Sequence, residues 1–445
     1  MFGTDGVRGV AGTELGGELA YRLGRATVAA LGSNGERRPA VAVGRDTRAS
    51  GEFLQAAVVA GICSAGGDAL VLDVCTTPGV AFLTADLHAQ AGVVISASHN
   101  PAGYNGIKLF GPSGYKLADE VEDEVEALVA GDDRTPATGR AIGRVRTVED
   151  ADERYLRHLV AAARGNLAGM RVVVDCANGA ASTMAPRLLA ALGAEVMAIN
   201  DAPDGWNINE MSGSTHPQTV ARAVVASGAD AGVTHDGDAD RALFADASGA
   251  VIDGDQVLAA CALDLHDRGE LDGGLLVTTV MANVGLRVAM QRQGIEVRQT
   301  RVGDRYVLEE MLRSGAMLGG EQSGHVIFLR EATTGDGLLT AVEFLTLAAQ
   351  RGCSVAELAS AMTRFPQVLV NVEVMDRGRL DDADAVWTAV RRSEDALGDG
   401  GRVLVRASGT EPLVRGMVEA GTEKEAGRHA NRIAEAVRAE LVAPG

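Results

Sequence analysis

The stretch AVAVGRDTRASGEFLQAAVVAGICSAGGDALVLD, residues 40–73, begins with an apolar strand, passes through a polar loop into an Ala/Val-rich helix, and ends in a second strand after two glycines. This order predicts a βαβ unit, with parallel strands and a helix covering the sheet. RVVVDCANGAASTMAPRLLAALGAEVMAIN (171–200) and LLVTTVMANVGLRVAMQRQGIEVRQT (275–300) have the same order. Their spacing of roughly 100–130 residues predicts one α/β domain repeated three times.

The C-terminal part of the chain follows a different pattern. QVLVNVEVMD (367–376) alternates like a half-exposed strand, RVLVRASGTEPLVRGMVEA (402–420) predicts a hairpin around a glycine turn, and KEAGRHANRIAEAVRAEL (424–441) predicts an amphipathic helix. We therefore expect an α/β protein with three repeated α/β domains, built on mixed, largely parallel sheets, and a smaller C-terminal α+β domain. The expected domains are residues 1–150, 151–253, 254–366 and 367–445.

The composition is that of a water-soluble protein with a strong negative charge. No apolar run approaches the roughly 18–20 residues that cross a bilayer, and the N-terminus MFGTDGVRG lacks the basic and apolar regions of a signal peptide. We therefore expect a cytoplasmic protein without a membrane partner. The net charge of −19 argues against nucleic-acid binding, because a protein that binds the phosphate backbone carries a basic face.

The strongest local signal for chemistry is AGVTHDGDADRALFAD (231–246), in which a strand end delivers Asp236, Asp238 and Asp240 at alternate positions, followed by Arg241. In a roughly extended loop, alternate side chains project to one side, so the three carboxylates could converge on one divalent ion. A calcium EF-hand is excluded, because its sixth-position glycine and twelfth-position glutamate are missing. A solvated acidic turn remains the alternative. Three carboxylates also leave Mg²⁺ short of ligands, so water or an anion must complete the shell.

ISASHNP (95–101) breaks an apolar strand into a serine-rich loop. Ser98 could be a hydrolase nucleophile, but the sequence has no G-x-S-x-G, and the adjacent His99 is not expected to face it, since sequence neighbours rarely do. Alternatively, Ser98 could carry a phosphoryl group whose oxygens supply the anion that residues 236–240, the Asp loop, lack. A plain serine-rich turn that caps a helix is the third interpretation.

Two further loops have the composition of ligand sites. RASGTEPLVR (406–415) offers the donors that a phosphate dianion takes from a compact loop, namely Arg406, Ser408, the Gly409 backbone, Thr410 and Arg415. GGEQSGH (319–325) presents Glu321, Ser323 and His325, which suit hydroxyl or amine partners. Either loop taken alone could be an ordinary turn. The sequence contains neither a P-loop nor a G-x-G-x-x-G pattern, which argues against a nucleotide ligand.

Taken together, these loops resemble those of the α-D-phosphohexomutase family. FGTDGVRG, ISASHNP, DGDADR, GEQSGH and RASGTEP occur in the order and spacing of that family, and the resemblance runs from residue 2 to about residue 420. It implies four domains around a central cleft and a phosphoserine at Ser98 rather than at Ser96. It also implies one Mg²⁺ per chain, held by Asp236, Asp238, Asp240 and a phosphate oxygen on Ser98.

The resemblance implies roles for the remaining site residues. Arg241 would face the transferring phosphoryl group, and Glu321 and Ser323 would bind sugar hydroxyls. The substrate's other phosphate would be bound by the 406–415 loop, through Arg406, Ser408, Gly409 and Thr410. Three more residues would line the reaction centre, where an acid/base residue is expected, namely Arg8, His99 and Lys108.

The sequence GEQSGH favours the family members that act on glucosamine phosphates. The implied reaction interconverts glucosamine 6-phosphate and glucosamine 1-phosphate through glucosamine 1,6-bisphosphate, and its product would feed UDP-N-acetylglucosamine and cell-wall precursor synthesis. The expected partners are small-molecule sugar phosphates and, in a homodimer, a second copy of the chain. Mutases acting on glucose or mannose phosphates are the main alternative. A sugar-phosphate sensor and a phosphatase of the haloacid dehalogenase type are others, although Asp240 stands where the latter has Thr or Val.

Overall fold

The computed structural model describes residues 1, 6–31, 38–131, 135–408 and 412–442. The chain forms two compact units, one of residues 1–281 with 298–360 and the other of residues 282–297 with 361–445. Within the described residues, no helix has both the length and the apolar character that a membrane span requires.

Three mixed sheets share a four-strand core, and their strands lie in the first unit except for Glu296 and Val297 of β13, which fall in the second. In chain order, their strands are β1 (Val7–Val10), β2 (Ala40–Arg45), β3 (Asp68–Val74), β4 (Ala91–Ile95), β5 (Tyr104–Phe110), β6 (Val145–Thr147), β7 (Arg171–Asp175), β8 (Glu195–Ile199), β9 (Ala231–His235), β10 (Ala242–Asp246), β11 (Val251–Ile252), β12 (Leu275–Thr279), β13 (Glu296–Thr300), β14 (Leu318–Gly320) and β15 (Val326–Phe328). The core orders are β5-β4-β2-β3, β10-β9-β7-β8 and β15-β14-β12-β13. The predicted threefold α/β repeat is thus confirmed.

Strand directions repeat along with strand order. In each core the first two strands form an antiparallel hairpin, and the second and third strands are parallel. The first sheet adds β1 beside β5 and β6 beside β3, and the second adds β11 beside β10. The opening stretch 40–73 forms parallel β2 and β3 joined by a helix, as its pattern predicts. Each repeat therefore presents one hairpin loop at the same position of its sheet.

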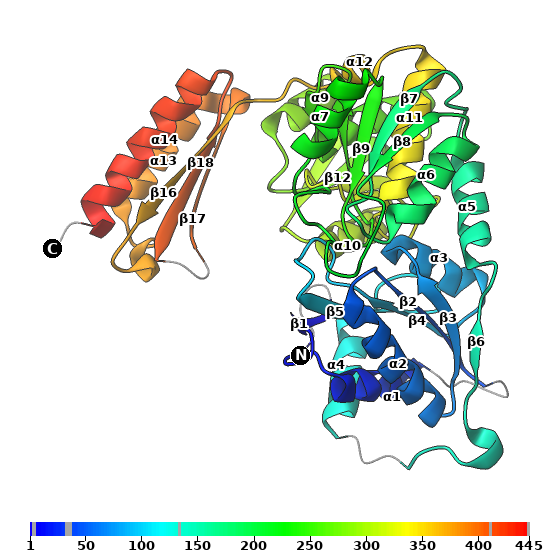
Figure 1. Cartoon of the computed structure of the whole chain (residues 1–445). Helices are drawn as coiled ribbons and strands as arrows, with labels where there is room; N and C mark the ends of the chain where they lie inside the picture. The colour runs from blue at the N-terminus through cyan, green and yellow to red at the C-terminus, as the bar shows by residue number, and fades with distance from the viewer. Residues whose placement is uncertain (2–5, 32–37, 132–134, 409–411, 443–445) are drawn as a thin grey trace. The chain divides into compact units, whose positions relative to one another are not determined.

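Helices cover these sheets on both faces (Figure 1). Those of the first unit are α1 (Gly17–Leu31), α2 (Ala49–Ser64), α3 (Thr77–Asp86), α4 (Asp119–Ala130), α5 (Ala151–Ala162), α6 (Ala181–Ala191), α7 (Gln218–Ser227), α8 (Gly254–Asp267), α10 (Asp304–Ser314), α11 (Gly337–Arg351) and α12 (Val355–Ala359). Alternation along β2 shows why: Val41 and Val43 pack with α1, α2 and α4, whereas Ala42 packs with α3 on the opposite face. The first sheet is therefore the middle of three layers.

Helices α1 and α2 approach each other at backbone distance. A Cβ on Gly24 would lie 2.3 Å from the Val58 carbonyl oxygen, and one on Gly61 would lie 2.1 Å from that of Tyr21. Gly→Ala inside a helix ordinarily stabilises by about 1 kcal/mol. Here the added methyl group must push the helices apart, so we expect Gly24→Ala to destabilise the protein by roughly 1–3 kcal/mol. Urea unfolding of the full chain measures this change.

The matched control is Gly427→Ala. Gly427 also lies inside a helix, α14 (Glu423–Val437), but no atom outside that helix's own backbone lies within 4 Å of an added Cβ. We expect this substitution to raise the free energy of unfolding. Equal gains for both variants would contradict the close packing of α1 and α2.

The second unit is an α+β domain, as predicted. β16 (Gln367–Glu373), β18 (Leu413–Glu419) and β17 (Arg402–Ala407) form an antiparallel sheet in the order β16-β18-β17. Helices α13 (Asp384–Leu397) and α14 pack on one face of it (Figure 1). Helix α9 (Val284–Arg292) also belongs to this unit, where the buried Glu419 carboxylate accepts a hydrogen bond from the Val284 amide at 2.9 Å.

Candidate active site

The three hairpin loops of the repeats carry the side chains that the sequence singled out. The β4–β5 loop holds Ser98, the β9–β10 loop holds Asp236 to Asp240, and the β14–β15 loop holds Glu321 to His325. The Ser98 hydroxyl donates to Asp236 Oδ2 at 2.6 Å, and His325 Nδ1 lies 3.6 Å from Asp240 Oδ2. The repeat thus places equivalent loops together, which explains how motifs far apart in the sequence form one site.

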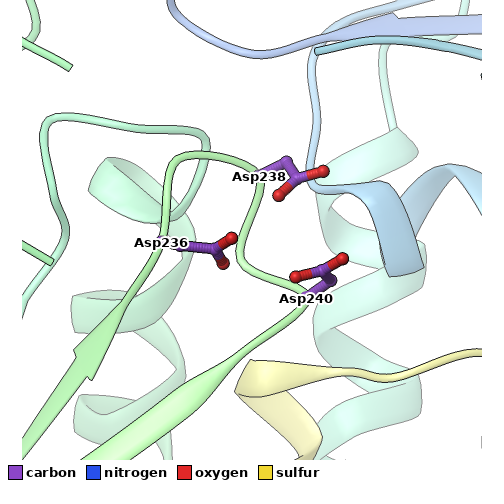
Figure 2. Close-up of side chains that lie close together, drawn as sticks. All are labelled: Asp236, Asp238 and Asp240. Carbon is purple, nitrogen blue, oxygen red and sulfur yellow. The ribbon is translucent and has the colours of Figure 1, made fainter. Parts of the chain in front are cut away.

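The Asp loop is a tight turn and not an extended segment. The Ala239 amide donates to the Asp236 carbonyl at 3.0 Å, and Ala239 has a φ of +57°. The expectation of an extended loop was therefore wrong. The carboxylates of Asp236, Asp238 and Asp240 nevertheless converge, because the turn folds back on itself, and each offers an oxygen within 4.8 Å of the others (Figure 2).

The unsatisfied oxygens of this cluster fit a metal ion. Asp236 Oδ1, Asp238 Oδ1 and Asp240 Oδ1 are buried, and none has a hydrogen-bond partner among the described residues. A buried anionic oxygen without a partner is costly, and three carboxylate oxygens are ligands that hard divalent cations prefer. The donor set and its burial therefore suit a metal site.

The other oxygens of the cluster are bound by the protein. Asp238 Oδ2 accepts hydrogen bonds from the Thr77 hydroxyl at 2.6 Å and from Lys108 Nζ at 3.0 Å. Lys108 Nζ also lies 4.0 Å from Asp240 Oδ2, and the lysine is buried on β5. The Asp loop is therefore anchored to the first repeat by contacts that leave one oxygen of each carboxylate without a hydrogen bond.

The surroundings shift the pKa values of Asp236 and Asp240 in opposite directions. Burial, and then the negative charges of Asp240 and Asp238, raise the pKa of Asp236 well above its ordinary value. Burial would also raise the pKa of Asp240, but its interaction with His325 and the positive charges of Lys108 and Arg241 outweigh burial and lower it. A cation in the cluster would offset the repulsion that Asp236 experiences.

Ser98 lies where β4 ends, in a left-handed conformation with a φ of +51°. This conformation turns its hydroxyl toward the Asp loop, and also to within 3.3 Å of His99 Nδ1. The expectation that His99 would not face Ser98 was therefore wrong, because the positive φ brings the two neighbours together. Ser96 differs: its hydroxyl donates to Asp46 Oδ2 at 2.6 Å and accepts from the Ser98 amide at 2.9 Å. Of the two serines, only Ser98 directs its hydroxyl at the carboxylates.

Arginines border the cluster. Arg241 Nε lies 3.7 Å from Asp240 Oδ1, and Arg8 lies on β1, opposite Gly106 of β5. Burial, and then the positive charges of Arg241 and Arg8, lower the pKa of the His99 imidazole. Lys108 and Arg241 thus lie beside the Asp loop, His99 contacts Ser98, and Arg8 acts electrostatically on His99.

The β14–β15 loop is ordered by its own polar groups. Glu321 Oε1 accepts from the Gly303 amide at 3.1 Å, and Glu321 Oε2 accepts from the Ser323 hydroxyl at 3.3 Å. The Gly335 amide donates to His325 Nε2 at 3.2 Å, so the ring proton lies on Nδ1, directed at Asp240. His325 therefore contacts the Asp loop, a role that the sequence did not suggest.

The fourth candidate loop lies in the second unit, at the tip of the β17–β18 hairpin. Arg406 and Arg415 are directly opposite each other across the two strands. The Ser408 amide donates to the Leu413 carbonyl at 2.8 Å, and Arg377 Nη1 donates to the Ser408 carbonyl at 2.7 Å. The other two predicted phosphate ligands, Gly409 and Thr410, lie outside the described residues.

Sequence reasoning missed the residues that support Ser98. Asp46 and Arg48 follow β2, and Asn209 lies in the second repeat; Arg48 and Asn209 donate to the Ser98 carbonyl, each at 2.9 Å. A signal was present, because GRDTR and ISASHNP both follow apolar strands whose ends meet if the strands are parallel neighbours. The structure pairs Arg45 with Ile95 in this way.

Comparison with known proteins identifies the family. Models of the four phosphoglucomutase/phosphomannomutase domains match in order: alpha/beta/alpha domains I, II and III at residues 1–135, 153–249 and 253–365, and the C-terminal domain at residues 369–436. The chain belongs to the phosphoglucomutase/phosphomannomutase family. The resemblance to phosphohexomutases that the five motifs suggested is thereby confirmed, and the chain is a mutase of the isomerase class.

Full-length relatives within the phosphoglucomutase/phosphomannomutase family include the phosphoglucosamine mutases of Symbiobacterium thermophilum, 54% identical over 99% of both chains, and of Rhodococcus jostii, 55% identical over 98% of both. Among solved structures, a family protein from Burkholderia thailandensis has a TM-score of 0.82 at 24% identity, covering 99% of this chain and 98% of that one. The N-acetylphosphoglucosamine mutase of Aspergillus fumigatus, in complex with GlcNAc-6P and magnesium, has a TM-score of 0.68 at 20% identity, covering 99% and 96%. The two solved structures confirm the fold.

Proposed function

We propose that this chain interconverts glucosamine 6-phosphate and glucosamine 1-phosphate, with Ser98 as the phosphoryl carrier. The observation that carries the proposal is the Ser98 hydroxyl, held 2.6 Å from Asp236 in a cluster of three carboxylates with one unsatisfied oxygen each. A phosphate on Ser98 would supply the anionic ligand that the cluster lacks. The choice of sugar is supported by full-length relatives named phosphoglucosamine mutase.

The reaction consists of two phosphoryl transfers in opposite directions. In the first, the bond from phosphorus to Ser98 Oγ breaks, a bond from phosphorus to the sugar's 1-oxygen forms, and glucosamine 1,6-bisphosphate results. In the second, the bond to the 6-oxygen breaks, Ser98 Oγ takes that phosphoryl group, and glucosamine 1-phosphate leaves. Asp236, Asp238 and Asp240 would hold Mg²⁺, which when bound neutralises charge on phosphoryl oxygens.

The two transfers need a group that takes and returns the hydroxyl proton. His99 fits this role better than Lys108. The lowered pKa of His99 keeps the imidazole neutral near pH 7, and the ring lies 3.3 Å from Ser98 Oγ. Lys108 Nζ instead lies 3.0 Å from Asp238 Oδ2 and 4.0 Å from Asp240 Oδ2, where a positive charge would stabilise the phosphoryl group. Arg241 and Arg8 would supply the remaining positive charge at this centre.

A second phosphate site is needed for the group that is not being transferred, and the β17–β18 hairpin supports one. Arg406 and Arg415 lie directly opposite each other on the two strands, and two neighbouring guanidinium groups suit a phosphate dianion. Ser408 stands at the tip of the same hairpin. The phosphate would be bound by Arg406, Ser408, Thr410, Arg415 and the Gly409 backbone.

The sugar itself would be bound by the β14–β15 loop. Glu321 is a carboxylate, and the 2-amino group of glucosamine is a cation near neutral pH, so the two attract each other. The 2-hydroxyl of glucose or mannose carries no such charge. Ser323 would add a hydroxyl to the same ligand set, and His325 would complete it from beside Asp240.

Comparison of three substrates tests the choice of sugar. We expect kcat/KM for glucosamine 6-phosphate to exceed that for glucose or mannose 6-phosphate by about 10- to 200-fold, the range that one favourable contact supplies. A coupled assay for each 1-phosphate product measures this ratio on the same preparation. Preference for mannose or glucose phosphate would show that the protein is instead a mutase for that sugar phosphate. Release of inorganic phosphate without isomerisation would overturn the mutase proposal.

A further inference from the structure

The Arg48 side chain forms most of its hydrogen bonds with the backbone of the loop that holds Ser98. The side chain is completely buried. Its two terminal nitrogens donate to three carbonyl groups of that loop's backbone, those of Ser98 at 2.9 Å, Asn100 at 2.8 Å and Pro101 at 2.5 Å. Its Nε donates to Asp46 Oδ2 at 2.9 Å, which balances the buried charge.

A second donor reaches the same backbone from another repeat. Asn209 Nδ2 donates to the Ser98 carbonyl at 2.9 Å and to the Asn100 carbonyl at 3.1 Å. The backbone N–H of Ser98 is held as well: it donates to Ser96 Oγ, and the Ser96 hydroxyl donates to Asp46 Oδ2. Both peptide groups of Ser98 are therefore fixed by buried side chains.

These hydrogen bonds surround a residue, Ser98, whose backbone conformation is unfavourable. A residue with a side chain in the left-handed region costs roughly 1–2 kcal/mol, and such residues persist only where the surroundings hold them. Ser98 has a φ of +51°. If φ relaxed to a negative value, the Cβ and the hydroxyl would turn away from Asp236, and the 2.6 Å contact would be lost.

We propose that Arg48, assisted by Asn209, is a positioning residue for phosphoryl transfer: it holds Ser98 in the left-handed conformation that aims its hydroxyl at the Asp cluster. This inference rests on the proposed function of Ser98. Arg48 and Asn209 touch the carbonyl of Ser98 and not its hydroxyl. Their removal should therefore slow the transfer steps and leave substrate affinity nearly unchanged.

Two substitutions test the positioning role without discarding the buried charge. Arg48→Lys keeps the partner of Asp46, but a single ammonium cannot reach three carbonyls at once. Asn209→Gly removes the second donor, and glycine accepts the φ of +60° found at that position. We expect each variant to reduce kcat by about 10- to 100-fold, as a small misplacement of a reacting group does, and to leave KM within about threefold.

A second readout follows the phosphate directly. Dephosphorylated enzyme is mixed with glucose 1,6-bisphosphate, and intact-mass spectrometry records the rate at which Ser98 gains a phosphate. We expect both variants to slow this step by the same factor as kcat. The matched control is Arg45→Lys. Arg45 is the last residue of β2, three residues before Arg48, but its side chain pairs with Asp73 at 2.7 Å and not with the Ser98 loop. Ser98 of this variant should gain its phosphate at the wild-type rate.

Outcomes separate this inference from the function on which it rests. Wild-type kcat and phosphorylation rate in both variants, with Ser98→Ala inactive, would overturn the positioning role alone. Losses that merely follow the folded fraction, measured by thermal unfolding, would also overturn it. Full turnover in Ser98→Ala would instead overturn the proposed function.

Discussion

Ser98→Ala is expected to reduce mutase turnover by roughly 10³-fold or more, because it removes the atom that forms and breaks a covalent bond in both transfers. The hydroxyl contacts Asp236 Oδ2 at 2.6 Å and His99 Nδ1 at 3.3 Å, both in the proposed reaction centre. Phosphopeptide analysis of active wild-type enzyme should find the phosphate on Ser98, and the variant should carry none. The decisive measurement is the rate of glucosamine 1-phosphate formation by the purified variant.

Folding of this variant needs its own control, since alanine keeps the unfavourable φ of +51°. Ser98→Gly provides one, because glycine adopts that conformation without strain and also lacks the hydroxyl. Both variants should be folded and equally inactive. Substantial isomerisation by either would contradict a phosphoserine mechanism, and phosphate on Ser96 in place of Ser98 would contradict the choice of serine.

Much of the fold was predictable because the elements of each repeat can be recognised from short stretches of neighbouring residues. The order of strand, loop, helix and strand in 40–73 recurs twice, and each copy forms the expected elements. Its less obvious consequence was not predictable. The antiparallel partner of β4, β9 or β14 follows a short polar loop in each repeat, and only the pairing shows that the three loops are equivalent.

The candidate site was predictable in composition but not in geometry. Three carboxylates at alternate positions suggested a cation site, yet they converge through a turn at Ala239 with a positive φ, which no single-sequence pattern indicates. His99 faces Ser98 for a similar reason. Local backbone conformations of this kind depend on tertiary contacts, such as those of Arg48 and Asn209 with the Ser98 carbonyl, and are specified only once the strands have paired.

Asp238→Asn is expected to weaken metal binding and to reduce kcat by roughly 10²- to 10³-fold, the loss typical of removing one group that stabilises transition-state charge. The amide removes one of three negative charges that converge within 4.8 Å and leaves Lys108 without its 3.0 Å carboxylate partner. Its binding readout needs no turnover: Mg²⁺ at about 100 times its Kd should stabilise the wild-type protein by about 2.7 kcal/mol, and the variant should respond much less.

Asp230→Asn is the matched control for this experiment. Asp230 precedes the same strand β9, but its carboxylate accepts from the Arg171 amide at 2.8 Å and lies half exposed, away from the cluster. It should keep both the Mg²⁺ response and the turnover. EDTA should abolish wild-type activity and excess Mg²⁺ should restore it. Undiminished activity in EDTA would remove the metal from the scheme, and the cluster's three unsatisfied oxygens would then need another cation.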